Sequence, residues 1–153
     1  MCPVPPLNSP AGADFALTFP PVPQWVRGAR DAVRTALGPA LPGLSDLVDT
    51  AVLLTSELVT NAVVASSGSL RPGPVGLYAA WAPVEDAVRV LVHDTAPGIP
   101  ASSAGLPPAE EEHGRGLPLI SLYAKDWGVC HHGPGPGKTV WFRLGSGPCA
   151  LAA

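Results

Sequence analysis

Charged residues are scarce in this chain, at 14% of 153 positions. Nine Lys and Arg stand against twelve Asp and Glu, so the formal net charge is -3, and the basic residues are scattered apart from one run near the N-terminus. A protein that binds nucleic acid through its phosphates needs a concentrated basic surface. The composition therefore argues against direct nucleic-acid binding.

Cysteine is also scarce, and Cys2, Cys130 and Cys149 lie far apart in the sequence. No pair of them has the spacing of a metal-ligand motif. The run Cys130–His132 is better explained by a strand end entering a turn, because no second ligand cluster accompanies it. An odd number of widely spaced cysteines predicts free thiols, which suit a reducing compartment.

Long apolar runs and targeting signals are missing as well. The N-terminus lacks a basic region followed by an apolar run, so it does not resemble a signal peptide. The most apolar stretch, 45–65, carries Asp46, Asp49 and Glu57, which argues against a membrane span. The length and the 46% share of hydrophobic residues predict one domain with a well-buried core, and the expected free thiols predict a cytoplasmic location.

Secondary-structure signals follow the order β-α-α-β-β-loop-α-β-β. Gly38 and Pro39 are expected to end the first helix, and Ser45 to cap the second. The composition of residues 95–115 predicts a long loop that is either a functional lid or disordered. We expect strands over 15–19, 75–81, 88–93, 128–131 and 139–144, a hairpin turn at 83–86, and helices over 24–37, 45–65 and 117–127.

These elements predict an α+β fold. A two-layer sandwich, with helices on one face of a mainly antiparallel sheet, accommodates the predicted order. We expect a disordered proline-rich arm over 1–13, a folded domain over 14–145 and a loose tail over 146–153.

The apolar second helix carries a carboxylate and an amide four residues apart. Glu57 and Asn61 share one helix face. Together they can hold a water, or help to hold a Mg²⁺ ion that also binds phosphate oxygens. Glu57 can also activate a hydroxyl or a water. The alternative, that both side chains lie at the solvated helix edge, is equally compatible with this segment alone.

Two further segments are compatible with a nucleotide. Asp94 ends an apolar strand, where it can accept a hydrogen bond from an exocyclic amine such as that of adenine, and Gly98 would let the chain pass close to a flat ring. Alternatively, Asp94 caps a turn. Gly114, Arg115 and Gly116 lead into a helix, whose N-terminus can receive a phosphate.

The last segment is Gly137–Trp141, where Lys138 and Thr139 open the final strand. Thr139 can supply a hydroxyl near a base, although on its own it is better explained as a plain strand residue. The four segments in this order resemble the GHKL ATPase superfamily, and more closely its small anti-sigma-factor and serine-kinase-like ATP-binding domains. The resemblance covers residues 15–144 and implies the Bergerat (GHKL) ATPase fold.

The resemblance implies a role for each matching residue. Glu57 matches the general base and Asn61 the Mg²⁺ ligand. Asp94 and Gly98 match the adenine-binding aspartate and its neighbouring glycine, and Thr139 matches the hydroxyl near adenine. The phosphate-facing end of the lid is matched by Gly114, Arg115, Gly116 and Leu117.

The family comparison also implies cofactors and partners. ATP or ADP with Mg²⁺ would occupy the site, and the domain would control a transcription regulator by partner switching, with a sigma factor or an anti-anti-sigma protein as partner. A homodimer and serine/threonine-protein kinase activity are implied in the same way. We do not expect a sensor histidine kinase, because these 153 residues leave no room for a dimerisation helix that carries a phospho-acceptor His.

Several departures from the family pattern favour binding over turnover. After Asn61 the family usually carries a basic or aromatic pair, but here the chain reads Ala62–Ala65. Ala96 stands at a usual glycine position, and Lys125 and Asp126 precede Trp127 where an Asp-Arg order is commoner. The alternative function is therefore a non-catalytic nucleotide-binding or degenerate module that sequesters a partner protein.

Overall fold

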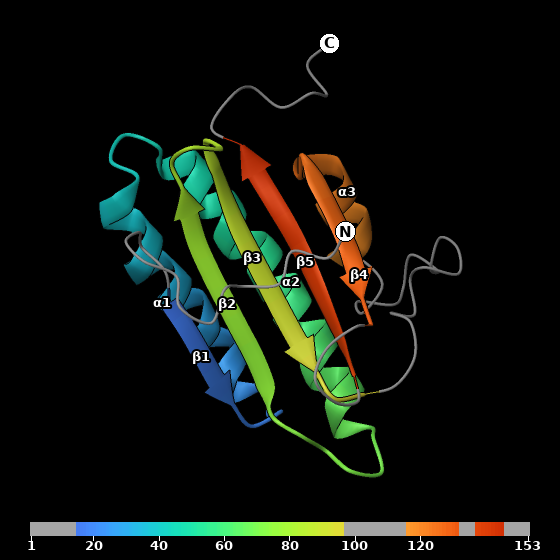
Figure 1. The fold of residues 1–153 in the computed structure, drawn as a ribbon. Coiled ribbons are helices and arrows are strands. Elements are labelled where there is room, and N and C mark those ends of the chain that lie inside the picture. The colour runs from blue at the N-terminus through green and yellow to red at the C-terminus, as the bar shows by residue number, and fades with distance from the viewer. Residues whose placement is uncertain (1–14, 97–115, 132–136, 146–153) are drawn as a thin grey trace.

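A computed structural model describes residues 15–96, 116–131 and 137–145. They form a five-stranded sheet in the order β1-β2-β3-β5-β4, with every pairing antiparallel. All three helices lie behind this sheet in Figure 1, so the predicted two-layer α+β sandwich is confirmed. The elements are β1 (Phe15–Phe19), α1 (Gln24–Ala40), α2 (Ser45–Ser67), β2 (Val75–Ala82), β3 (Ala87–Asp94), α3 (Gly116–Tyr123), β4 (Asp126–Cys130) and β5 (Lys138–Gly145).

Alternation along β3 and β5 decides which side chains face the helices. Val88, Val90 and Val92 of β3 are buried, and they lie opposite Leu144, Phe142 and Val140 of β5. Residues two apart on a strand share a face, so this row is the sheet's contribution to the core. The helices cover it, with α2 in contact with β2, β3 and β5 and with α1 and α3 on either side.

Helix α2 is the central core helix. It is long and apolar enough to pass a test for a membrane-spanning segment, but half of the qualifying window is buried inside the domain. Its buried side chains pack between the sheet and α1. The predicted interpretation as a core helix rather than a membrane span agrees with this packing.

Helix boundaries differ from the predicted ones at two places near the N-terminus. Helix α1 runs through Pro39 to Ala40, so the expected stop at Gly38 and Pro39 is wrong. Both Leu37 and Leu41 are buried, and this burial outweighs the hydrogen bond that proline cannot make in the last turn. Ser45 is not the cap of α2, because the N-cap is Leu44, which packs on the core.

The third helix ends earlier than expected. Helix α3 stops at Tyr123, and β4 already begins at Asp126, so a helix reaching Trp127 is wrong. The backbone N–H of Lys125 donates to the carbonyl of Arg143 in β5 at 2.8 Å. Pairing with β5 therefore outweighs the helical propensity of residues 124–127.

Cys130, at the end of β4, is disulfide-bonded. The expectation of a free thiol is therefore wrong for this residue. Sequence spacing could not reveal the bond, because a disulfide depends on how close two chain segments come in space. Expectations for 1–13, for most of the loop 95–115 and for 146–153 fall outside the described residues.

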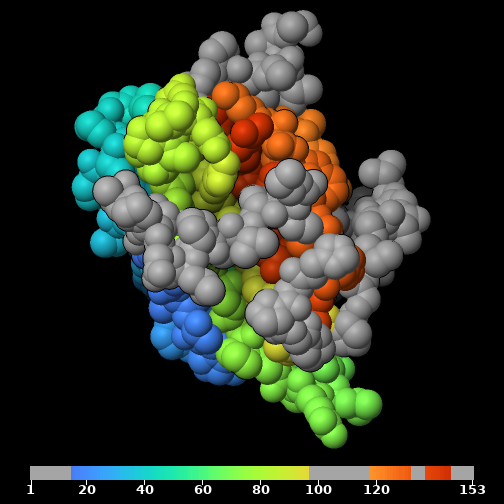
Figure 2. Space-filling model, in the orientation of Figure 1, coloured from blue at the N-terminus to red at the C-terminus, as the bar shows by residue number. Residues whose placement is uncertain are grey.

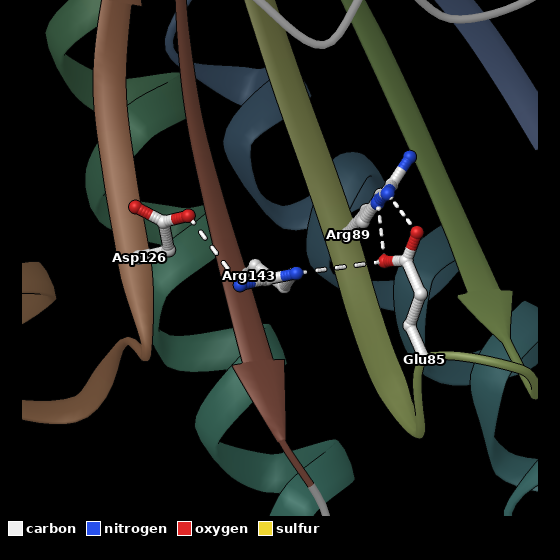
Figure 3. Close-up of polar contacts among 4 residues, drawn as sticks. All are labelled: Glu85, Arg89, Asp126 and Arg143. Atoms are coloured by element: carbon white, nitrogen blue, oxygen red, sulfur yellow. Dashed lines mark hydrogen bonds and ion pairs between the residues drawn. The ribbon is translucent and has the colours of Figure 1, made fainter. Parts of the chain in front are cut away.

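The face of the sheet away from the helices carries an ionic cluster (Figure 3). Arg89 and Arg143 lie directly opposite each other on β3 and β5, and Glu85 pairs with both. Asp126 of β4 adds a contact of 3.4 Å to Arg143. The carboxylates offset the repulsion of two opposed cations, although such exposed pairs add little net stability.

Candidate functional site

The predicted site residues that the structure describes lie on elements that touch one another. Asp94 ends β3, Lys138 begins β5, and these two strands are hydrogen-bonded neighbours. Helix α2, which carries Glu57 and Asn61, contacts both strands and also α3. In Figures 1 and 2 the β2–β3 hairpin turns at the top, and β3 runs down from it and ends near the bottom of the sheet.

Asp94 is a buried carboxylate, only 2% exposed. Its Oδ1 accepts a hydrogen bond from the backbone N–H of Ala96 at 2.9 Å, which closes a turn after the strand. The turn-capping interpretation of Asp94 is therefore correct, but it is not the whole account. A second donor, the Nζ of Lys138, reaches the same Oδ1 at 2.9 Å.

Gly137 allows the strand end to approach this turn. Its φ of 117° is one that L side chains rarely adopt. A Cβ there would collide with the carbonyl oxygen of Asp94 and lie 2.8 Å from Cα of Thr95. On the other side, a Cβ on Gly73 would lie 2.5 Å from Oγ1 of Thr95. Two glycines therefore let neighbouring backbone close around Asp94 and Thr95.

Glu57 and Asn61 occupy half-buried positions one turn apart on α2. Glu57 has an interaction partner in the structure. Among the described residues, no three His, Cys, Asp or Glu side chains cluster as a metal site. Mg²⁺ commonly takes only one or two protein oxygens and completes its shell with water and phosphate. One carboxylate and one amide are a donor set that fits this chemistry.

Thr139 does not share a face with Asp94. In the register it lies opposite His93, while Asp94 lies opposite Lys138. Lys138 is 5% exposed and Thr139 is half-buried, as alternation along a strand requires. The role of Thr139 near a base stays a prediction.

Gly116 and Leu117 form the start of α3, and α3 contacts α2. Helix α3 therefore begins where the glycine-rich segment was expected to lead into a helix. Three other predicted residues, Gly98, Gly114 and Arg115, lie outside the described residues, so their roles also stay predictions.

A family model described as the histidine kinase-like ATPase domain matches residues 19–144. The chain belongs to this family. The match spans every described element except the start of β1 and the last residue of β5, so it includes Glu57, Asn61, Asp94 and Thr139. The predicted identification as a GHKL-type ATPase domain is thereby confirmed.

Solved structures support the same fold for this histidine kinase-like ATPase domain. One is a structure of the RsbU and RsbW domains of Rv1364c from Mycobacterium tuberculosis, with a TM-score of 0.57 and 19% sequence identity. The alignment covers 86% of this chain and 31% of that chain, so this chain spans about a third of that protein fragment. No curated protein matches the sequence significantly.

Sequence reasoning missed Lys138 as a site residue. From the sequence it is predicted only to open a strand, although the sequence holds a signal for a buried charge at this position. Lys138 begins a run in which every second residue is apolar, followed by Val140, Phe142 and Leu144. A lysine in register with a buried row must find an anionic partner. Only the pairing of β3 with β5 shows that this partner is Asp94.

Proposed function

We propose that this histidine kinase-like ATPase domain binds Mg²⁺-ATP and uses the bound nucleotide to control a transcription regulator by partner switching. The observation that carries the proposal is the buried Asp94 carboxylate at the end of β3, within a chain that belongs to this family. A desolvated carboxylate at a strand end is a strong acceptor for the exocyclic amine of adenine.

In this proposal the phosphates extend from the base toward α2 and the start of α3. The N-terminus of α3 provides unpaired N–H groups and positive potential for an anion. Asn61 would ligate Mg²⁺, and Glu57 would orient or deprotonate an attacking hydroxyl. When bound, the ion would neutralise phosphate charge. Among the predicted phosphate contacts, Gly114 and Arg115 belong to this proposal as well.

Titration calorimetry tests the nucleotide-binding proposal directly. We expect wild-type protein to bind ATP with a dissociation constant in the micromolar range, and more tightly with Mg²⁺ than with EDTA. Asn61→Ala should remove most of the Mg²⁺ effect, on the order of tenfold in affinity, because one metal ligand is lost. ATP binding in EDTA should change little in this variant, and Thr60→Ala serves as the neighbouring control.

Binding of a sigma factor or an anti-anti-sigma protein is the partner relationship that we propose. Its support is the fold shared with the RsbU and RsbW domains of Rv1364c. Co-purification with the products of neighbouring genes, with and without Mg²⁺-ATP, tests it. A partner whose retention is unchanged by nucleotide would contradict partner switching.

A second candidate function is nucleotide-dependent sequestration without phosphate transfer. The segment after Asn61 motivates it, because Val64 stands exposed, at 42%, where the family usually offers basic or aromatic groups. Without a cation from this part of α2, less charge is available to stabilise the transferring phosphoryl group.

Glu57→Gln distinguishes phosphate transfer from sequestration. If the domain is a serine kinase, the substitution should lower transfer of ³²P from ATP to a partner serine by about 10²–10⁴-fold, because the general base is lost. ATP affinity should stay close to that of the wild type. A wild-type protein that binds ATP but labels no partner, and whose regulation in cells survives Glu57→Gln, would support the sequestering function instead.

A further inference from the structure

Lys138 is a buried lysine, and its side chain forms an ion pair with an equally buried aspartate. Its Nζ lies 2.9 Å from Oδ1 of Asp94, and the two side chains are 5% and 3% exposed. The residues lie directly opposite each other in the antiparallel register of β3 and β5. Charged side chains are rarely this buried unless they are paired.

Stability alone gives no reason for an ion pair at this place. A buried pair loses the hydration of both charges, and a well-packed apolar pair of similar size is often at least as stable. The next inward-facing pair along the same two strands is apolar, since Val92 lies opposite Val140. The sheet can therefore close here without charges, and the pair at Lys138 needs another explanation.

Both hydrogen bonds to the Asp94 carboxylate are made to the same oxygen. Among the described residues, the donors to Asp94 are the Ala96 N–H and the Lys138 Nζ, and both reach Oδ1. The two donors hold Oδ1 in place, and neither of them reaches Oδ2. Paired with an ammonium group, Asp94 is a carboxylate, which can only accept hydrogen bonds.

We propose that Lys138 is the positioning residue that makes Asp94 selective for a 6-aminopurine over a 6-oxopurine. This inference rests on the proposed nucleotide function. An adenine amine can donate to Oδ2, whereas the 6-oxo group of hypoxanthine would present an acceptor to an acceptor. A site that loses its hydrogen bond in this way rejects the wrong ligand strongly.

The test compares ATP with inosine triphosphate (ITP), which replaces the 6-amino group by an oxo group. Calorimetry should give a wild-type preference for ATP of about a hundredfold. In Lys138→Met, which keeps the length of the side chain without its charge, the preference should fall below about tenfold, mainly through weaker ATP binding.

A matched control separates positioning from folding. Val140→Ala removes buried volume at the next inward-facing position of β5, so it should lower stability while the ATP-to-ITP preference is kept. If Lys138→Met is too unstable to measure, Lys138→Gln keeps a neutral donor at the position. The ATP-to-ITP preference of Lys138→Gln should be weaker than that of the wild type and of Val140→Ala, but it should not be lost completely.

The outcomes are distinguishable. Wild-type protein that binds neither nucleotide overturns the proposed function, and this inference with it. Wild-type protein that binds both equally, or prefers ITP, overturns the inference while nucleotide binding stands. A Lys138→Met or Lys138→Gln variant that keeps the full preference also overturns it, and shows that Lys138 only stabilises the sheet.

Discussion

Asp94→Ala should abolish measurable ATP binding, with a loss of affinity on the order of a hundredfold or more. The substitution removes the proposed acceptor of the adenine amine. It also strands the Lys138 ammonium, which is 5% exposed, without its partner. Leaving one member of a buried ion pair unpaired costs about 3–5 kcal/mol, so the free energy of unfolding should fall as well.

The double variant Asp94→Ala with Lys138→Met separates these two effects. Removing both charges should recover most of the stability that Asp94→Ala loses, because no buried charge is left unpaired. ATP binding should stay lost. Urea unfolding and calorimetry measure the two quantities independently, and recovery of ATP binding in the double variant would show that Asp94 does not contact the base.

Gly137→Ala should be among the most destabilising single substitutions in this domain, at about 3 kcal/mol or more. Alanine would have to adopt a φ of 117°, and its Cβ would collide with backbone atoms of Asp94 and Thr95. Backbone at a strand junction cannot move aside as a flexible side chain can. Urea unfolding monitored by circular dichroism measures the effect.

Gly38→Ala is the matched control for Gly137→Ala. Gly38 lies in the last turns of α1, and a Cβ there meets nothing within 4 Å. Alanine is a better helix former, so stability should be unchanged or raised by up to about 1 kcal/mol. Equal unfolding midpoints for Gly137→Ala and wild type would mean that β5 does not approach Asp94 as the structure describes.

Much of the fold could be predicted from patterns within single segments. Alternation placed strands at 15–19 and 139–144, and the apolar run with Glu57 and Asn61 placed the long helix. Such patterns are local, because the period of a helix or strand is set by its own backbone. The expected ends at Pro39 and Trp127 were wrong, because packing of Leu41 and pairing with β5 outweighed local propensity.

The candidate site, like the fold, has a part that the sequence predicts and a part that only the tertiary structure reveals. The sequence by itself determined the fold class, the family motifs and the candidate residues Glu57, Asn61 and Asp94, because each is recognisable from its neighbours along the chain. Only the tertiary structure decided that Lys138, and not Thr139, faces Asp94. The physical reason is strand register: the pairing of β3 with β5 joins residues 44 apart in sequence, and a shift of one residue would exchange their faces.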